Sequence, residues 1–329
     1  MFTRFNRRRT LLALCIACGT FAAYAPAQAN EFPNGPIRII VPYTAGATND
    51  AIPRIIGPKL AELLGVPVIV ENRPGAGGDI GVKYVIDAKP DGQVLLMASN
   101  AVITRQATAA RPAYDTLRDL RPVILVGDQP MVLVVAQNFK TNSVEELIEI
   151  ARQKPESVSY ATPGAGTPHQ LASELLSSQA KVRLLHIPYK GTAASLVDTA
   201  AERVTMTWAT PASGRAMLES GKVKPLGVTA GARLKSMPDV KTLKESGIDG
   251  LTSGFWYGFM APKGTPEDVV QKIYSAMRTA IDDPAVADQL RGLTLELTPM
   301  DPKQFEELVD HDLKQWQQVA KSANISVEE

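Results

Sequence analysis

Three short segments rich in glycine and small polar residues are the strongest candidates for a binding site. They span residues 43–50 (YTAGATND), 72–78 (NRPGAGG) and 162–167 (TPGAGT). Glycine lets backbone N–H groups approach a ligand closely, and helix N-termini attract anions. A carboxylate facing such a loop would accept several charge-assisted hydrogen bonds, each worth roughly 1.5–3 kcal/mol. One such loop alone indicates an ordinary tight turn, whereas three in one chain make an anion-binding cleft an equal alternative.

The glycine spacing does not indicate a nucleotide site. Gly75-x-Gly77 is followed by Ile80, and Gly164-x-Gly166 by His169, where a dinucleotide fingerprint needs a third glycine. The chain also contains no G-x-x-x-x-G-K-[ST] segment for phosphate binding. We therefore expect no cofactor.

The histidines do not assemble an enzyme pattern. His169 follows the third glycine-rich loop, so a ligand contact and a structural role are equally open. His186 lies in an apolar stretch, as a core histidine would, and His311 lies in an amphipathic helix, as a solvated residue would. The chain contains no G-x-S-x-G, no H-E-x-x-H and no Cys/His cluster, and no carboxylate pair stands out. We therefore expect a protein without catalytic residues or a metal site.

The elements that carry these loops alternate between strand and helix. In the first part, strands are expected at 36–42, 66–70 and 93–99, with helices at 51–64 and 79–88, the first of them capped by Asp50. This β-α-β-α-β order predicts a largely parallel sheet. The same order recurs with strands at 131–136, 157–161, 183–187, 203–209 and 224–229. Two amphipathic helices, beginning near residues 265 and 301, follow at the end.

The N-terminal segment predicts export. Four arginines precede an apolar run from 11 to 25, and Ala27-Gln28-Ala29 is typical of a signal-peptidase site. Cleavage after about Ala29 would remove both cysteines, Cys15 and Cys18, and leave a net charge of −3. That charge argues against nucleic-acid binding. About 300 remaining residues predict two lobes rather than a single core.

A series of motifs resembles the Bug family of periplasmic binding proteins, the receptors of tripartite tricarboxylate transporters. The series begins with Val41-Pro42-Tyr43, Gly46-Ala47-x-x-Asp50-x-x-x-Arg54 and the run VENRPGAGG at 70–78. It continues in order along the chain with Pro90-Asp91-Gly92, Gly164-x-Gly166-Thr167, Pro188-Tyr189-Lys190-Gly191, Asp198 and Trp256-Tyr257-Gly258.

The resemblance implies an α/β fold of the type II periplasmic-binding-protein class, with two α/β lobes joined by two crossing segments and a ligand cleft between them. We place the crossings near 127–131 and 253–257. Lobe 1 then comprises residues 30–127 and 254–329, and lobe 2 comprises residues 128–253.

The resemblance also implies a set of ligand-binding residues, because in that family a carboxylate is held mainly by backbone N–H groups and bridging waters. The expected contacts are Tyr43, Ala45, Gly46, Ala47 and Asn100 in lobe 1, and Thr162, Gly164, Gly166, Thr167, His169, Tyr189 and Asp198 in lobe 2. Asp198 would accept a hydrogen bond from the ligand or, alternatively, serve as a structural partner. Lys190 would either line the cleft or be a solvated turn residue.

The function that the resemblance implies is capture of a small organic carboxylate by a monomeric periplasmic receptor that delivers it to a membrane permease. Presentation of a ligand to a periplasmic sensor domain and a periplasmic hydrolase are the alternatives. The chain departs from the family pattern at Ala47, at His169-Gln170 and at residues 199–202, all near the expected cleft. The sequence therefore leaves the identity of the carboxylate open.

Overall fold

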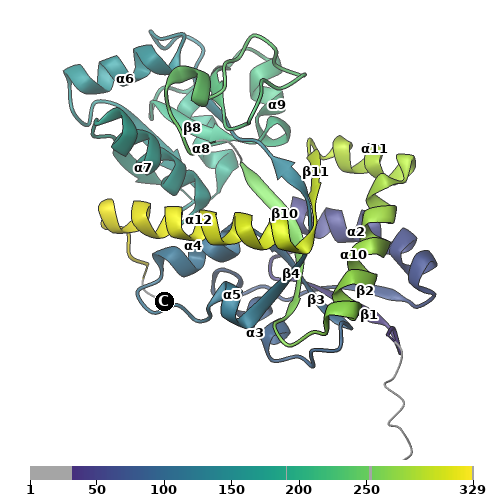
Figure 1. Ribbon diagram of the computed structural model, residues 1–329. Helices are drawn as coiled ribbons and strands as arrows, with labels where there is room; N and C mark the ends of the chain where they lie inside the picture. The colour runs from purple at the N-terminus through teal and green to yellow at the C-terminus, as the bar shows by residue number, and fades with distance from the viewer. Residues whose placement is uncertain (1–31, 190, 252–253, 328–329) are drawn as a thin grey trace, which may run out of the picture.

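The computed structural model describes residues 32–189, 191–251 and 254–327. The predicted signal peptide at 1–29, with Cys15 and Cys18, lies outside the described residues, as do Lys190 and Ser253. Within the described part of the chain, no helix is both long and apolar enough to cross a membrane. The strands divide into two sheets, each with helices on both faces (Figure 1).

The first sheet has six strands in the order β11-β4-β10-β3-β1-β2. Their bounds are β1 (Ile37–Val41), β2 (Val68–Asn72), β3 (Val94–Ser99), β4 (Leu120–Gln129), β10 (Phe255–Pro262) and β11 (Glu296–Met300). β1 pairs in parallel with β2 and β3, whereas the pairs β3–β10, β10–β4 and β4–β11 are antiparallel. The parallel arrangement expected for the first three strands is confirmed, since β1 pairs in parallel with both β2 and β3. The sheet as a whole is mixed, because the chain leaves and re-enters it through two long antiparallel strands, β4 and β10.

Helices cover both faces of the first sheet. One face packs against α2 (Thr48–Leu64), α10 (Glu267–Asp282) and α11 (Pro284–Gly292), around a core that includes Ile39, Ile56 and Ile273. The other face packs against α3 (Asp79–Ile86), α4 (Asn100–Thr108), α5 (Thr116–Asp119) and α12 (Pro302–Ser322). A short 3-10 turn, η1 (Ala76–Gly78), precedes α3.

The second sheet has five strands in the order β7-β6-β8-β5-β9. They are β5 (Val132–Ala136), β6 (Ser159–Thr162), β7 (Leu185–Pro188), β8 (Met206–Ala209) and β9 (Val223–Val228). The strands alternate along the chain with α6 (Val144–Gln153), α7 (Pro168–Ala180), α8 (Thr192–Ala200), α9 (Pro211–Glu219) and the 3-10 turn η2 (Lys244–Ser246). β6 pairs in parallel with β7 and β8, and β5 pairs antiparallel with β8 and β9, so this sheet is also mixed.

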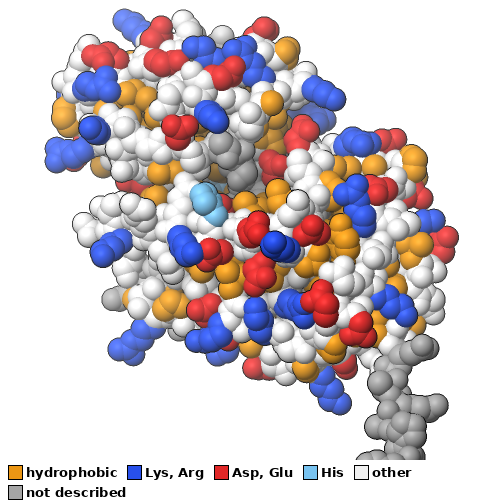
Figure 2. Space-filling view, in the orientation of Figure 1, with side chains coloured by type: hydrophobic (Ala, Val, Ile, Leu, Met, Phe, Trp, Pro, Cys, Tyr) orange, Lys and Arg blue, Asp and Glu red, His pale blue; other side chains and the backbone are white. Residues whose placement is uncertain are grey.

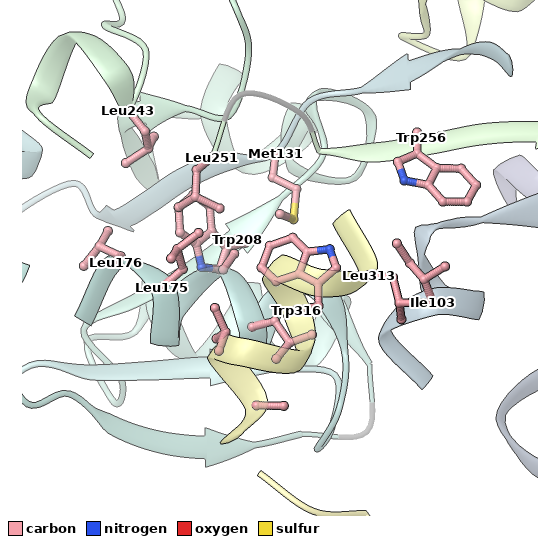
Figure 3. Packing of buried hydrophobic residues seen from close by; sticks show 14 of the residues in the cluster. Ile103, Met131, Leu175, Leu176, Trp208, Leu243, Leu251, Trp256, Leu313 and Trp316 are labelled. Atoms are coloured by element: carbon pink, nitrogen blue, oxygen red, sulfur yellow. The ribbon is translucent and has the colours of Figure 1, made fainter. Parts of the chain in front are cut away.

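The two sheets are joined by a continuous core. One buried cluster contains Leu96 of β3 together with Met131, Leu175 and Trp208 of the second sheet region, and Trp316 of α12 lies in the same cluster (Figure 3). α12 runs from the first sheet across to the second (Figure 1), and it contacts both α4 and α7. The surface is hollowed where the two lobes meet (Figure 2). The molecule therefore has two lobes that pack against one long helix.

Candidate functional site

The first glycine-rich loop follows β1 and leads into α2. The helix begins at Thr48 with Ala47 as its N-cap, so Asp50 is the third helical residue. The expectation that Asp50 is the N-cap is wrong, because Asp50 lies inside the helix. Its carboxylate reaches back and accepts a hydrogen bond from the Gly46 N–H at 3.0 Å. Ala45, Gly46 and Ala47 are exposed.

Asp50 also ties this loop to the second glycine-rich loop. Its Oδ1 accepts hydrogen bonds from Arg54 Nε at 3.0 Å and from Asn72 Nδ2 at 2.9 Å. The Arg54 guanidinium, together with the N–H of Gly46 and the amide of Asn72, lowers the pKa of Asp50 to about 2, so the carboxylate is ionised. Asn72 Nδ2 also donates to the Tyr43 carbonyl at 3.1 Å. Neither Asn72 nor Arg54 was expected from the sequence to hold this loop.

The third glycine-rich loop follows β6 and leads into α7, whose N-cap is Thr167. The Gly166 N–H donates to Gln170 Oε1 at 2.8 Å, and the Gly164 N–H donates to Thr162 Oγ1 at 3.2 Å. Thr167 Oγ1 donates to the Gly164 carbonyl at 2.8 Å. The loop is therefore held by its own side chains and by Gln170 at the third position of the helix.

His186 of β7 supports the same loop. Gln170 Oε1 faces Gly166, so its Nε2 donor faces His186 Nδ1 at 3.4 Å. Nδ1 must then be an acceptor, and the proton of the neutral ring lies on Nε2, which is 2.7 Å from Thr162 Oγ1. Burial lowers the pKa of His186, in agreement with a neutral ring. His186 was expected to be a core histidine, and its ring stacks on Tyr160 at 4.9 Å.

The two lobes thus carry the same local arrangement, offset along the chain. In each, the glycine before the N-cap donates its N–H to the side chain at the third helical position: Gly46 to Asp50 and Gly166 to Gln170. The acceptor is an ionised carboxylate in lobe 1 and a neutral amide in lobe 2. The roles of Gly46, Gly164 and Gly166 as ligand donors stay predictions, because in this structure their N–H groups have acceptors within the protein.

Two further predicted residues lie at the second crossing. Asn100, the first residue of α4, donates from Nδ2 to the Gly254 carbonyl at 2.8 Å. The ring of His169 in α7 lies 5.4 Å from the ring of Phe255. Asn100 Oδ1 and His169 Nδ1 are both buried without a hydrogen-bond partner. Burial lowers the pKa of His169 to about 4, so this ring is neutral at pH 7.

Tyr189 and Asp198 form a separate group on lobe 2. The Tyr189 hydroxyl donates to Asp198 Oδ2 at 2.9 Å, and Arg203 Nη1 donates to Asp198 Oδ1 at 2.8 Å. Hydrogen bonds from Tyr189 and then Arg203 lower the pKa of Asp198. Both carboxylate oxygens therefore have partners in the protein, as the structural alternative for Asp198 expects. Its contact with a ligand stays a prediction.

The third loop lies close to the opposite lobe at Gly166, whereas a Cβ built on Gly46 of the first loop would meet no atom within 4 Å. A Cβ built on Gly166 would lie 2.9 Å from Thr108 Oγ1 at the end of α4 and 2.8 Å from Val327 Cγ2. No hydrogen bond between described residues links the first loop to the third.

A separate cavity of about 440 Å³ at the lobe junction is lined by Trp256, Asp312, Trp316 and neighbours from both lobes. The described residues include no group of three or more His, Cys, Asp or Glu that could hold a metal ion.

A family model, a sequence relative and a solved structure all indicate the same protein family. The family model of the tripartite tricarboxylate transporter family receptor matches residues 52–325. The UPF0065 protein in the tcbD-tcbE intergenic region of Pseudomonas sp. (strain P51) is 35% identical, over 95% of this chain and 94% of that protein. The structure of the periplasmic binding protein BugD is 32% identical, with a TM-score of 0.72 over 91% of this chain and 100% of that one.

Two further solved structures were determined with ligands. Rpa4515 of R. palustris, with adipate, is 28% identical, with a TM-score of 0.75 over 91% of this chain and 100% of that one. MatC from Rhodopseudomonas palustris, with bound malate, is 28% identical, with a TM-score of 0.71 over 88% of this chain and 99% of that one. The expected two-lobed α/β periplasmic-binding-protein fold is confirmed. The expectation that the chain is not an enzyme is confirmed as well, since the matched family and these neighbours are solute receptors.

Proposed function

Because this chain belongs to the tripartite tricarboxylate transporter receptor family, we propose that it captures a small organic carboxylate in the periplasm and delivers it to a membrane permease of the tripartite type. The observation that carries the proposal is the matched pair of glycine-rich loops, one at the start of α2 and one at the start of α7. Relatives of the same fold hold adipate and malate. Oxygens of a dicarboxylate could be shared between two such loops.

In this proposal, the ligand lies between lobe 1 (30–127 and 254–329) and lobe 2 (128–253), and the lobes close on it. Residues 43–47 and 162–167 supply backbone donors. Asn100 and His169 stand at the crossing, where a buried carbonyl oxygen and a ring nitrogen lack partners. A buried polar atom without a partner costs about 1–3 kcal/mol, so a rearrangement on ligand binding that satisfies either atom would favour the bound state.

The proposal includes export as a monomer. The basic and apolar segment at 1–29 would direct secretion, with cleavage after about Ala29. The remaining chain would carry a net charge of −3, which suits a receptor for small solutes better than a protein that binds nucleic acid.

A thermal-unfolding screen of the chain from residue 30 onward tests this function. The panel contains adipate, malate, tricarboxylates, acidic amino acids and aromatic acids, with neutral sugars as controls. A cognate carboxylate should stabilise the protein by about 2.7 kcal/mol at a hundredfold excess over its Kd. The proposal is wrong if a neutral solute raises the melting temperature and no carboxylate does.

A further inference from the structure

The Gln170 side chain holds a donor that the proposed function needs. The Gly166 N–H lies at the start of α7, where it would face an anion, but it donates to Gln170 Oε1 at 2.8 Å. Gln170 is only 8% exposed, so water cannot readily replace it as the acceptor. A ligand carboxylate can accept from Gly166 only after the Gln170 oxygen has turned away.

The orientation of the Gln170 amide depends on His186. With Oε1 on Gly166, the amide nitrogen faces His186 Nδ1 at 3.4 Å, an arrangement that requires an unprotonated Nδ1. A proton on Nδ1 would place two donors against each other. The amide would then gain a charge-assisted hydrogen bond by turning Oε1 toward the imidazolium, and the Gly166 N–H would lose its acceptor.

We propose that Gln170 is a positioning residue that controls whether the Gly166 N–H is available to the ligand, and that the protonation of His186 controls Gln170. This inference rests on the proposed binding of a carboxylate at the third loop. It requires carboxylate affinity to increase as the pH falls through the pKa of His186. The corresponding acceptor in lobe 1, Asp50, is held by Arg54 and Asn72 and does not change in this range.

The surroundings of His186 permit this change. The Tyr160 ring of β6 stacks on the imidazole at 4.9 Å, and the Tyr160 hydroxyl donates a hydrogen bond to Glu174 of α7. Thr162 Oγ1 accepts from His186 Nε2 in either protonation state. Since burial lowers the pKa of His186, the change should occur below the ordinary histidine pKa of 6.5.

The first test needs no ligand. The amide proton shift of Gly166 and the ring protons of His186 are followed by NMR from pH 8 to pH 5 in the wild type, Gln170→Met and His186→Gln. The Gly166 shift should follow the His186 titration in the wild type and lose that component in both variants. His311→Gln, on the exposed face of α12, is the matched control. In this variant the Gly166 shift should still follow the His186 titration. A Gly166 shift that does not follow His186 overturns the inference.

The second test measures the Kd of malate and of adipate by calorimetry at pH 7.5 and 5.5. The ligand's own protonation is the same for all proteins, so the ratio of wild-type to variant Kd isolates the protein's contribution. Between pH 7.5 and pH 5.5, the affinity of the wild type should increase about fivefold more than the affinity of Gln170→Met. A factor of this size corresponds to one regained hydrogen bond. If the Kd of the wild type and the Kd of Gln170→Met change equally with pH, the role of Gln170 is refuted, whereas the proposed function is not. If neither acid binds, the carboxylate that gives the largest stabilisation in the unfolding screen takes their place. If no carboxylate of that panel binds, the proposed function is refuted, and the Gly166 titration still decides the role of Gln170.

Discussion

At the scale of single residues, one carboxylate organises the first glycine-rich loop, at residues 43–50. Asp50 receives hydrogen bonds from Gly46 in its own loop, from Arg54 one turn along its helix and from Asn72 at the end of β2. The sequence indicated the loop correctly, because glycines and a helix start are local signals. The partnership with Asn72 could not be predicted, since it depends on β1 and β2 lying side by side in parallel.

Asp50→Asn should destabilise the protein by about 1–3 kcal/mol at pH 7, because the new NH2 group would place a donor either against the Gly46 N–H or against Arg54 and Asn72. The folded-state pKa of Asp50, about 2, lies below its usual value of 3.8. Its stabilising effect is therefore present above about pH 4 and is lost as the pH falls toward 2. Urea unfolding at pH 7 and pH 3 measures the difference between wild type and variant, which should shrink at pH 3.

Asp288→Asn is the control for this prediction, because Asp288 pairs with Arg291 on the exposed surface of α11. It should change stability by less than about 0.5 kcal/mol. An Asp50 variant as stable as this control would show that the carboxylate does not hold the loop.

At the scale of secondary-structure elements, the crossing segments are parts of long strands. The crossings were expected near 127–131 and 253–257, and these ranges include the end of β4 and the start of β10, in the middle of the first sheet. Pro122 and Gly127 in β4, and Gly258 in β10, conceal these strands, because proline and glycine are uncommon within central strands. The β4–β10 pairing shows register shifts near Gly258 and Met260, which accommodate Pro122.

Gly254→Ala should destabilise the junction between the lobes. A Cβ at this position would lie 2.1 Å from the Gln129 carbonyl oxygen, 2.7 Å from Pro130 Cα and 2.8 Å from Met131 N. All three are backbone atoms of the other crossing, so the two crossings would have to separate. We expect a loss of about 1–3 kcal/mol in the free energy of unfolding, measured in urea.

Gly292→Ala, at the exposed end of α11, is the matched control, since a Cβ there would meet nothing within 4 Å. It should change stability by less than about 0.5 kcal/mol. Equal effects of the two substitutions would mean that the crossings do not need their close approach.

At the scale of the whole molecule, the two-lobed fold could be predicted from the order of the motifs along the chain, and the matched family bears it out. The position of α12 across both lobes could not, because its stripe of Phe305, Leu313 and Trp316 specifies a buried face but not its partners. The ligand is harder still to predict. Backbone N–H groups occur in every sequence, so a site built from them leaves little trace in residue types.

The central claim, recognition of a carboxylate by backbone donors, is tested most directly by a calorimetric titration of adipate against adipamide. The diamide keeps the length and shape of the acid and removes both charges. If the account is correct, the acid binds at one site per chain with an affinity near the micromolar range, about −8 kcal/mol, and adipamide binds at least about tenfold more weakly. If adipate does not bind, malate takes its place with its own diamide. Equal affinity for an acid and its diamide would contradict the account.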